Sequence, residues 1–135
     1  MVYNSDFLLL IDGSSAYMTS GFETLNLHPQ LKKAIDALGF TQMTPIQQKV
    51  LKYTLAGHDA IGRAQTGTGK TAAFLISVIN DLLNNPIQDQ RFRGEPRALI
   101  PAPTRALPSQ IDSDAPALTT FSSLPAVTFL RLAPL

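Results

Sequence analysis

The sequence predicts an α/β domain with parallel strands and flanking helices, and three observations support this fold class. Stretches with the spacing of amphipathic helices alternate with short apolar runs of strand length, as in domains built on a parallel sheet. Glycine and proline residues mark the boundaries between these stretches. A glycine-rich segment, residues 64–71, separates an apolar run from a helical pattern, which is the context of a phosphate-binding loop.

Two helices are predicted upstream of the glycine-rich segment. The first has Pro29 near its start and Gly39 just past its end. Its apolar face is formed by Leu31, Ala34, Ile35 and Leu38. The second has Thr44 as its N-cap, Pro45 at its first helical position and Gly57 as its stop. A short strand, residues 59–63, then leads into the loop.

The glycine-rich segment has the residue types that phosphate binding requires. Gly67 and Gly69 allow positive φ angles and a close approach of the backbone to a ligand. The amides at the start of the next helix would point at an anion, aided by the helix dipole. We expect Lys70 to reach the outer phosphates and the Thr71 hydroxyl to ligate Mg²⁺. The predicted phosphate-binding residues are Ala64, Gln65, Thr66, Gly67, Thr68, Gly69, Lys70 and Thr71; the general pattern begins with Gly where this chain has Ala64.

Downstream of the loop the local rules begin to conflict. The loop helix is predicted to stop at Asn84-Asn85-Pro86, and Arg97–Ile100 is predicted to form the next parallel strand. Pro101 ends that strand without a ladder donor, and Pro116 would interrupt the following helix at a cost of about 3 kcal/mol. Because six of the ten prolines follow Ile100, we expect residues 111–135 to form a divergent, poorly ordered tail.

The upstream segment and the loop together resemble a known family. Phe22 and the run Gly-Phe-Thr-Gln-Met-Thr-Pro-Ile-Gln at residues 39–47, with the Ala-initial loop, resemble the Q motif and motif I of DEAD-box ATP-dependent RNA helicases. The resemblance implies a partial RecA-like P-loop domain over residues 22–110, incomplete at its C-terminal side. It also implies that Gln47 hydrogen-bonds the adenine of ATP or ADP while Phe22 and Phe40 pack around the base. A carboxamide matches adenine's amino group and N7, whereas guanine presents an acceptor in place of that donor. Gln47 alone is equally consistent with an ordinary helix-start residue.

Other parts of the family pattern are altered or missing. Pro103, Thr104 and Arg105 resemble the start of motif Ia, which in the family contacts the RNA backbone, but Ala106 stands where the family has Glu. The Asp-Glu-Ala-Asp tetrad, which in the family supplies Mg²⁺-binding and water-orienting acids, does not occur in this sequence. We therefore expect ATP and Mg²⁺ as cofactors, weak RNA binding, and little or no ATP hydrolysis by this chain alone.

Residues 1–21 are interpreted as an N-terminal extension. Its apolar run Phe7–Ile11 followed by Asp12 has the form of a Mg²⁺-holding strand, but it precedes the loop, so a rearranged strand order would be required. An added strand or a floppy extension is the preferred interpretation.

The composition sets further limits. The net charge of +1 gives no global field for binding nucleic acid, and the cluster Arg91, Arg93 and Arg97 reads as a solvated loop. The chain has no cysteine, which excludes disulfides, and its two histidines make a poor zinc site. With no membrane-length apolar run, a cytoplasmic protein is expected.

The sequence is consistent with three interpretations of function. The first is an ATP-binding fragment of a DEAD-box ATP-dependent RNA helicase. The second is a decayed or frame-disturbed remnant without activity, suggested by the clustered prolines and the altered motif Ia. The third is a stand-alone adenine-nucleotide-binding module that regulates a partner.

Overall fold

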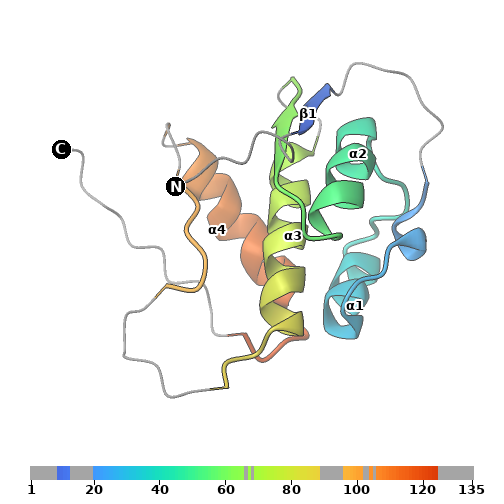
Figure 1. The fold of residues 1–135 in the computed structure, drawn as a ribbon. Coiled ribbons are helices and arrows are strands. Elements are labelled where there is room, and N and C mark those ends of the chain that lie inside the picture. Colours follow the sequence, from blue (N-terminus) through green and yellow to red (C-terminus); the bar gives the residue numbers. More distant parts are fainter. Residues whose placement is uncertain are drawn as a thin grey trace.

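The computed structural model describes residues 20–65, 67, 69–88, 96–101, 104 and 106–124, together with the backbone of residues 9–12. In these ranges a parallel pair of strands lies at one end of a group of helices (Figure 1). The strands are β1 (Leu9–Asp12) and β2 (Ala60–Arg63). The helices are η1 (Phe22–Thr24), α1 (Pro29–Ala37), α2 (Pro45–Thr54), α3 (Lys70–Asn84) and α4 (Ala106–Thr119). The predicted α/β fold class is confirmed.

The sheet joins the N-terminal extension to the strand before the phosphate loop. β1 pairs with β2 in parallel, and the register runs from Leu9 opposite Ala60 to Asp12 opposite Arg63. The strand-like run of the extension is therefore an added strand. On β2, a Cβ added at Gly62 would lie 3.2 Å from a methyl group of Val50, so the strand packs closely against α2.

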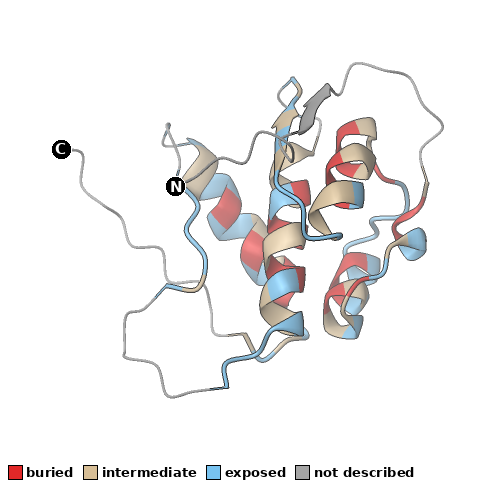
Figure 2. Cartoon of the chain, in the orientation of Figure 1, coloured by how far each residue is buried: buried red, intermediate tan, exposed pale blue. Residues whose placement is uncertain are grey.

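The hydrophobic core lies between the inward faces of the helices (Figure 2). It is made mainly of Leu31, Ile35, Ile46, Val50, Leu51, Ile76, Ile79, Ile111 and Leu118, all of them almost fully buried. The apolar face predicted for the first helix is confirmed at Leu31, Ala34 and Ile35. Leu38 is 41% exposed, because α1 ends at Ala37 and Leu38 is its C-cap.

The strand predicted over residues 97–100 is wrong. These residues belong to no helix or strand, and Leu99 is 79% exposed. Arg97 instead donates through its guanidinium to the carbonyls of Leu82 and Asn85, at 3.3 Å to the first, and so caps the C-terminal end of α3. Since Arg97 holds this segment at the end of α3, the segment does not reach the edge of the sheet, where it would need a partner strand.

The predicted interruption at Pro116 is also wrong, because α4 continues through it to Thr119. Proline removes one helical hydrogen bond, but Ile111, Ala115 and Leu118 are each no more than 3% exposed and contribute burial that offsets this loss. Residues 111–119, which we assigned to a poorly ordered tail, thus belong to a packed helix. No helix in the described part of the chain is long and apolar enough to cross a membrane.

Candidate functional site

The phosphate loop lies between the end of β2 and the start of α3. Gly67 and Gly69 have φ angles of 80° and 84°, which confirms the predicted left-handed turns. Gly69 is the N-cap of α3, and the helix begins at Lys70. The first amides of a helix have no intrahelical acceptors, so this end of α3 is suited to an anion. Thr66 and Thr68 lie outside the described residues.

Lys70 and Thr71, the first two residues of α3, have partners that fix their side chains near the loop. The Lys70 ammonium donates to the carbonyl of Ala64 at 2.5 Å and so bridges the two ends of the loop. An ammonium group has three donors, so this bond leaves donors for phosphate oxygens. The Thr71 hydroxyl donates to Oε1 of Gln110 on α4 at 3.4 Å. A hydroxyl that donates its proton keeps its lone pairs for a cation, which is the arrangement a Mg²⁺ ligand needs.

Gln47 connects the start of α2 to the loop. Its side-chain Oε1 accepts from the backbone amide of Thr44 at 2.9 Å. The backbone amide of Gln47 donates to the Thr44 hydroxyl at 3.4 Å, which completes a capping box. Its Nε2 donates to the carbonyl of Gly69 at 3.2 Å. The side chain is 7% exposed. A carboxamide has two N–H donors and two oxygen lone pairs, so these bonds leave one of each for an adenine edge.

The two aromatic residues predicted to hold the base stack on each other but differ in exposure. The ring centroids of Phe22 and Phe40 are 6.0 Å apart with the planes inclined by 28°. Phe22 is 4% exposed and belongs to the core, whereas Phe40 is 38% exposed. The Phe22 amide donates to the Thr41 carbonyl at 3.0 Å, which ties the two segments together. Phe40 is therefore the ring that can contact a ligand, and Phe22 supports it from beneath.

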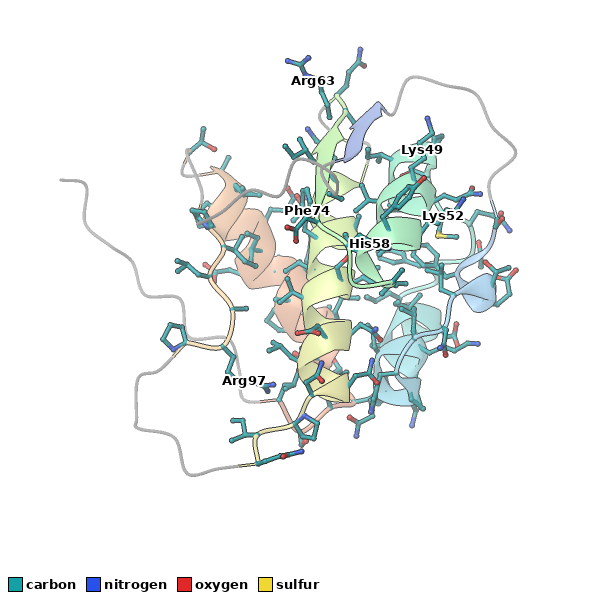
Figure 3. All side chains as sticks on the ribbon, viewed as in Figure 1. Lys49, Lys52, His58, Arg63, Phe74 and Arg97 are labelled. Atoms are coloured by element: carbon teal, nitrogen blue, oxygen red, sulfur yellow. The ribbon has the colours of Figure 1, made fainter. Side chains whose placement is uncertain are left out.

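The segment that resembles the RNA-binding motif is described only in part. Thr104 is exposed, and α4 begins at Ala106, while Pro103 and Arg105 lie outside the described residues. Of the predicted basic cluster, Arg97 caps the C-terminal end of α3. Arg91 and Arg93 lie outside the described residues. Figure 3 shows Arg97 near the far end of α3 from the loop and Arg63 at the loop end of β2. The described arginines therefore form no shared patch beside Thr104.

Two features of the site were not predicted from the sequence. Gln110 contacts the predicted Mg²⁺ ligand Thr71 from a helix that is separated from it by 39 positions in the chain. The bond from Gln47 to Gly69 spans 22 positions. Both depend on how helices pack, and no local residue pattern signals them.

Comparison of the sequence with known proteins identifies a family and close relatives of this chain. A family model described as DEAD/DEAH box helicase matches residues 44–131. The chain is 60% identical over 109 residues to the ATP-dependent RNA helicase RhlB of Pseudomonas aeruginosa and 50% identical over 103 residues to that of Pectobacterium atrosepticum. These matches cover 81% and 76% of the chain but only 28% and 24% of the relatives.

A solved structure agrees with the sequence relatives. The RNA helicase Prp28 from Chaetomium thermophilum bound to ADP superposes with a TM-score of 0.58 at 32% identity, over 76% of this chain and 26% of that one. The chain therefore corresponds to roughly a quarter of each of these larger proteins.

Proposed function

Because the chain belongs to the DEAD/DEAH box helicase family, we propose that it binds ATP or ADP with Mg²⁺ and retains adenine and phosphate recognition. Its α/β fold is part of a RecA-like domain. The observation that carries the proposal is the bond from Gln47 to Gly69, which connects the predicted adenine-reading residue to the phosphate loop. Together with the bond that the Thr44 amide donates to Oε1 of Gln47, that bond leaves one donor and one acceptor of the carboxamide for the base.

Phosphate recognition would come from the loop amides, Lys70 and Thr71. The positive φ angles of Gly67 and Gly69 support this, since they turn the loop backbone at the start of α3. The Mg²⁺ ion would be held by the Thr71 hydroxyl and by phosphate oxygens, and when bound it would neutralise phosphate charge. Phe40 would pack on the base from its exposed side.

We propose neither RNA unwinding nor rapid ATP hydrolysis for this chain. The sequence contains no Asp-Glu-Ala-Asp tetrad and spans about a quarter of the length of the helicases that it matches. A carboxylate that orients the attacking water is needed for turnover. We therefore propose binding with little or no ATPase, and RNA-stimulated turnover at the rate of an intact helicase would refute that part.

The proposal is tested by thermal unfolding of the purified chain with Mg-ADP and with Mg-GDP. At about 100 times its dissociation constant, a ligand adds about 2.7 kcal/mol to the free energy of unfolding, which raises the melting temperature by several degrees. We expect this shift with ADP and not with GDP. Lys70→Ala should abolish it, whereas Lys52→Ala, an exposed lysine on α2, should not. A melt that ADP does not shift would favour the inactive remnant.

A further inference from the structure

Within the described residues, the hydroxyl of Thr71 bonds to one side chain, and that side chain comes from α4. It donates to Oε1 of Gln110 at 3.4 Å. Thr71 is the second residue of α3, and Gln110 is the fifth residue of α4. Figure 1 shows α4 alongside α3, with both helices beginning toward the same end of the molecule. The contact therefore joins the start of the loop helix to the start of α4.

This bond departs from the way other helical hydroxyls of the chain are satisfied. Three of them donate to the carbonyl of the residue four positions earlier in their own helix, namely Thr54, Ser77 and Thr119. Thr71 lacks such an acceptor, because the residue four positions before it is Gly67, which lies in the loop. The direction of its proton is thus set by another helix.

Packing between the two helices fixes the backbones that carry this pair. Ile111, which follows Gln110, is 3% exposed, and Ala73, two residues after Thr71, is 1% exposed. Both belong to the hydrophobic core. The Gln110 side chain is itself exposed, so it contributes little to that core. Its place beside Thr71 follows from how α4 packs on α3.

We propose that Gln110 is a positioning residue for the Mg²⁺ ion of a bound adenine nucleotide, and that it acts through Thr71. The inference rests on the proposed nucleotide binding. Gln110 Oε1 takes the hydroxyl proton, so that the lone pairs of the hydroxyl stay available to the ion. Hydrogen bonds to groups that carry charge are shorter and about twice as strong as neutral ones, so we expect this contact to tighten when the hydroxyl ligates a cation.

The test compares ADP affinity in Mg²⁺ and in EDTA by isothermal titration calorimetry on the full chain. The ratio of the two affinities is the Mg²⁺ factor, and the affinity of free ADP for Mg²⁺ cancels between variants. We expect a factor of about ten in the unmodified chain. Acceptors behind a metal ligand commonly contribute about 10-fold to 100-fold in metal affinity, so Gln110→Leu should reduce the factor to about twofold or less. ADP affinity in EDTA should stay unchanged.

Two variants separate the acceptor from the bulk of the side chain. Gln110→Glu keeps an acceptor oxygen and should retain at least the full Mg²⁺ factor. Gln88→Leu makes the same chemical change as Gln110→Leu at an exposed position beyond the C-terminal end of α3 and should leave the factor unchanged. Leucine and glutamine have similar helix propensities, so Gln110→Leu should unfold in urea at nearly the original midpoint.

A double-mutant cycle tests whether Gln110 acts through Thr71. Thr71→Val removes the hydroxyl and keeps the shape of the side chain, and it should lower the Mg²⁺ factor as Gln110→Leu does. Adding Gln110→Leu to Thr71→Val should then have no further effect, because the shared interaction is already lost. A second, additive loss would mean that Gln110 acts on the ion independently, and it would overturn the proposed role.

The remaining outcomes distinguish this proposal from nucleotide binding itself. A full Mg²⁺ factor in Gln110→Leu overturns the positioning role and leaves nucleotide binding intact. So does an unmodified chain that binds ADP equally in Mg²⁺ and in EDTA. Loss of ADP affinity in EDTA by Gln110→Leu also overturns the role, since the residue then supports the loop without a metal. An unmodified chain that binds ADP in neither condition refutes nucleotide binding, and the role of Gln110 with it.

Discussion

Replacing Gln47 with alanine would remove the side chain that joins α2 to the phosphate loop. The substitution abolishes the 2.9 Å bond from the Thr44 amide and the 3.2 Å bond to the Gly69 carbonyl. The two hydrogen bonds together contribute about 2 kcal/mol, and the loss of one buried methylene adds about 0.8 kcal/mol. We expect Gln47→Ala to lower the free energy of unfolding by about 3 kcal/mol.

The assay is urea unfolding followed by circular dichroism, with Thr44→Ala as the comparison. Thr44→Ala removes the hydroxyl that accepts from the Gln47 amide at 3.4 Å, and a bond of this length should contribute about 0.5–1 kcal/mol. The slope of free energy against urea should stay constant, so that the midpoint reports stability. If Gln47→Ala costs no more than Thr44→Ala, then the Gln47–Gly69 bond does not stabilise the fold and the reasoning fails.

Two further pairs of substitutions test the loop and α4. Gly69 and Gly57 have φ angles of 84° and 85°, but an added Cβ would lie 2.3 Å from Nε2 of Gln47 at the first and in open space at the second. Gly57→Ala should therefore cost about 1 kcal/mol and Gly69→Ala at least about twice as much in urea unfolding, and equal costs would contradict the predicted clash. Pro116→Ala should raise the free energy of unfolding by about 1–3 kcal/mol, because it restores a helical amide at an exposed position. Ser113→Ala, exposed on the same helix, should change it by less than about 0.5 kcal/mol, and a Pro116→Ala protein no more stable than the original would show that α4 accommodates the proline without cost.

The start of α2 shows what the sequence can predict. Thr44, Pro45 and Gln47 lie within four consecutive positions, and the capping box that they form depends on their own backbone. The positive φ angles of Gly67 and Gly69 are likewise local consequences of residue type. The N-cap Thr44 and the glycine turns at Gly67 and Gly69 were therefore predicted at the correct residues.

The strands show why prediction from one sequence stops short. A strand is stabilised by a partner that is distant in sequence, so an apolar run alone does not reveal its pairing. The run at Leu9–Asp12 pairs with β2 in parallel and forms a strand. Residues 97–100 also include an apolar stretch, Ala98–Ile100. Arg97, however, donates to a carbonyl at the C-terminal end of α3, and the segment belongs to no strand.

The same local reasoning failed at Pro116 for a different physical reason. A helix propensity penalty of about 3 kcal/mol is decisive only where nothing else holds the helix. Ile111 and Leu118 are each no more than 3% exposed, and burial of two such side chains contributes about 3–6 kcal/mol. Tertiary packing therefore outweighs the helix penalty of Pro116. The proline lowers the stability of the protein but does not interrupt α4.

The placement of groups on helices and strands decides which functions the chain can retain. Gln47, Lys70 and Thr71 occupy the first turns of α2 and α3, and these helices are held by a core that lies among the helices. Nucleotide binding of the proposed kind therefore depends little on how wide the sheet is. Turnover depends on carboxylates that strands deliver to the same edge, and in the described strands Asp12 is the one acidic residue. Because the described strands carry no second acidic residue, we expect ADP and ATP to be bound and ATP to remain unhydrolysed.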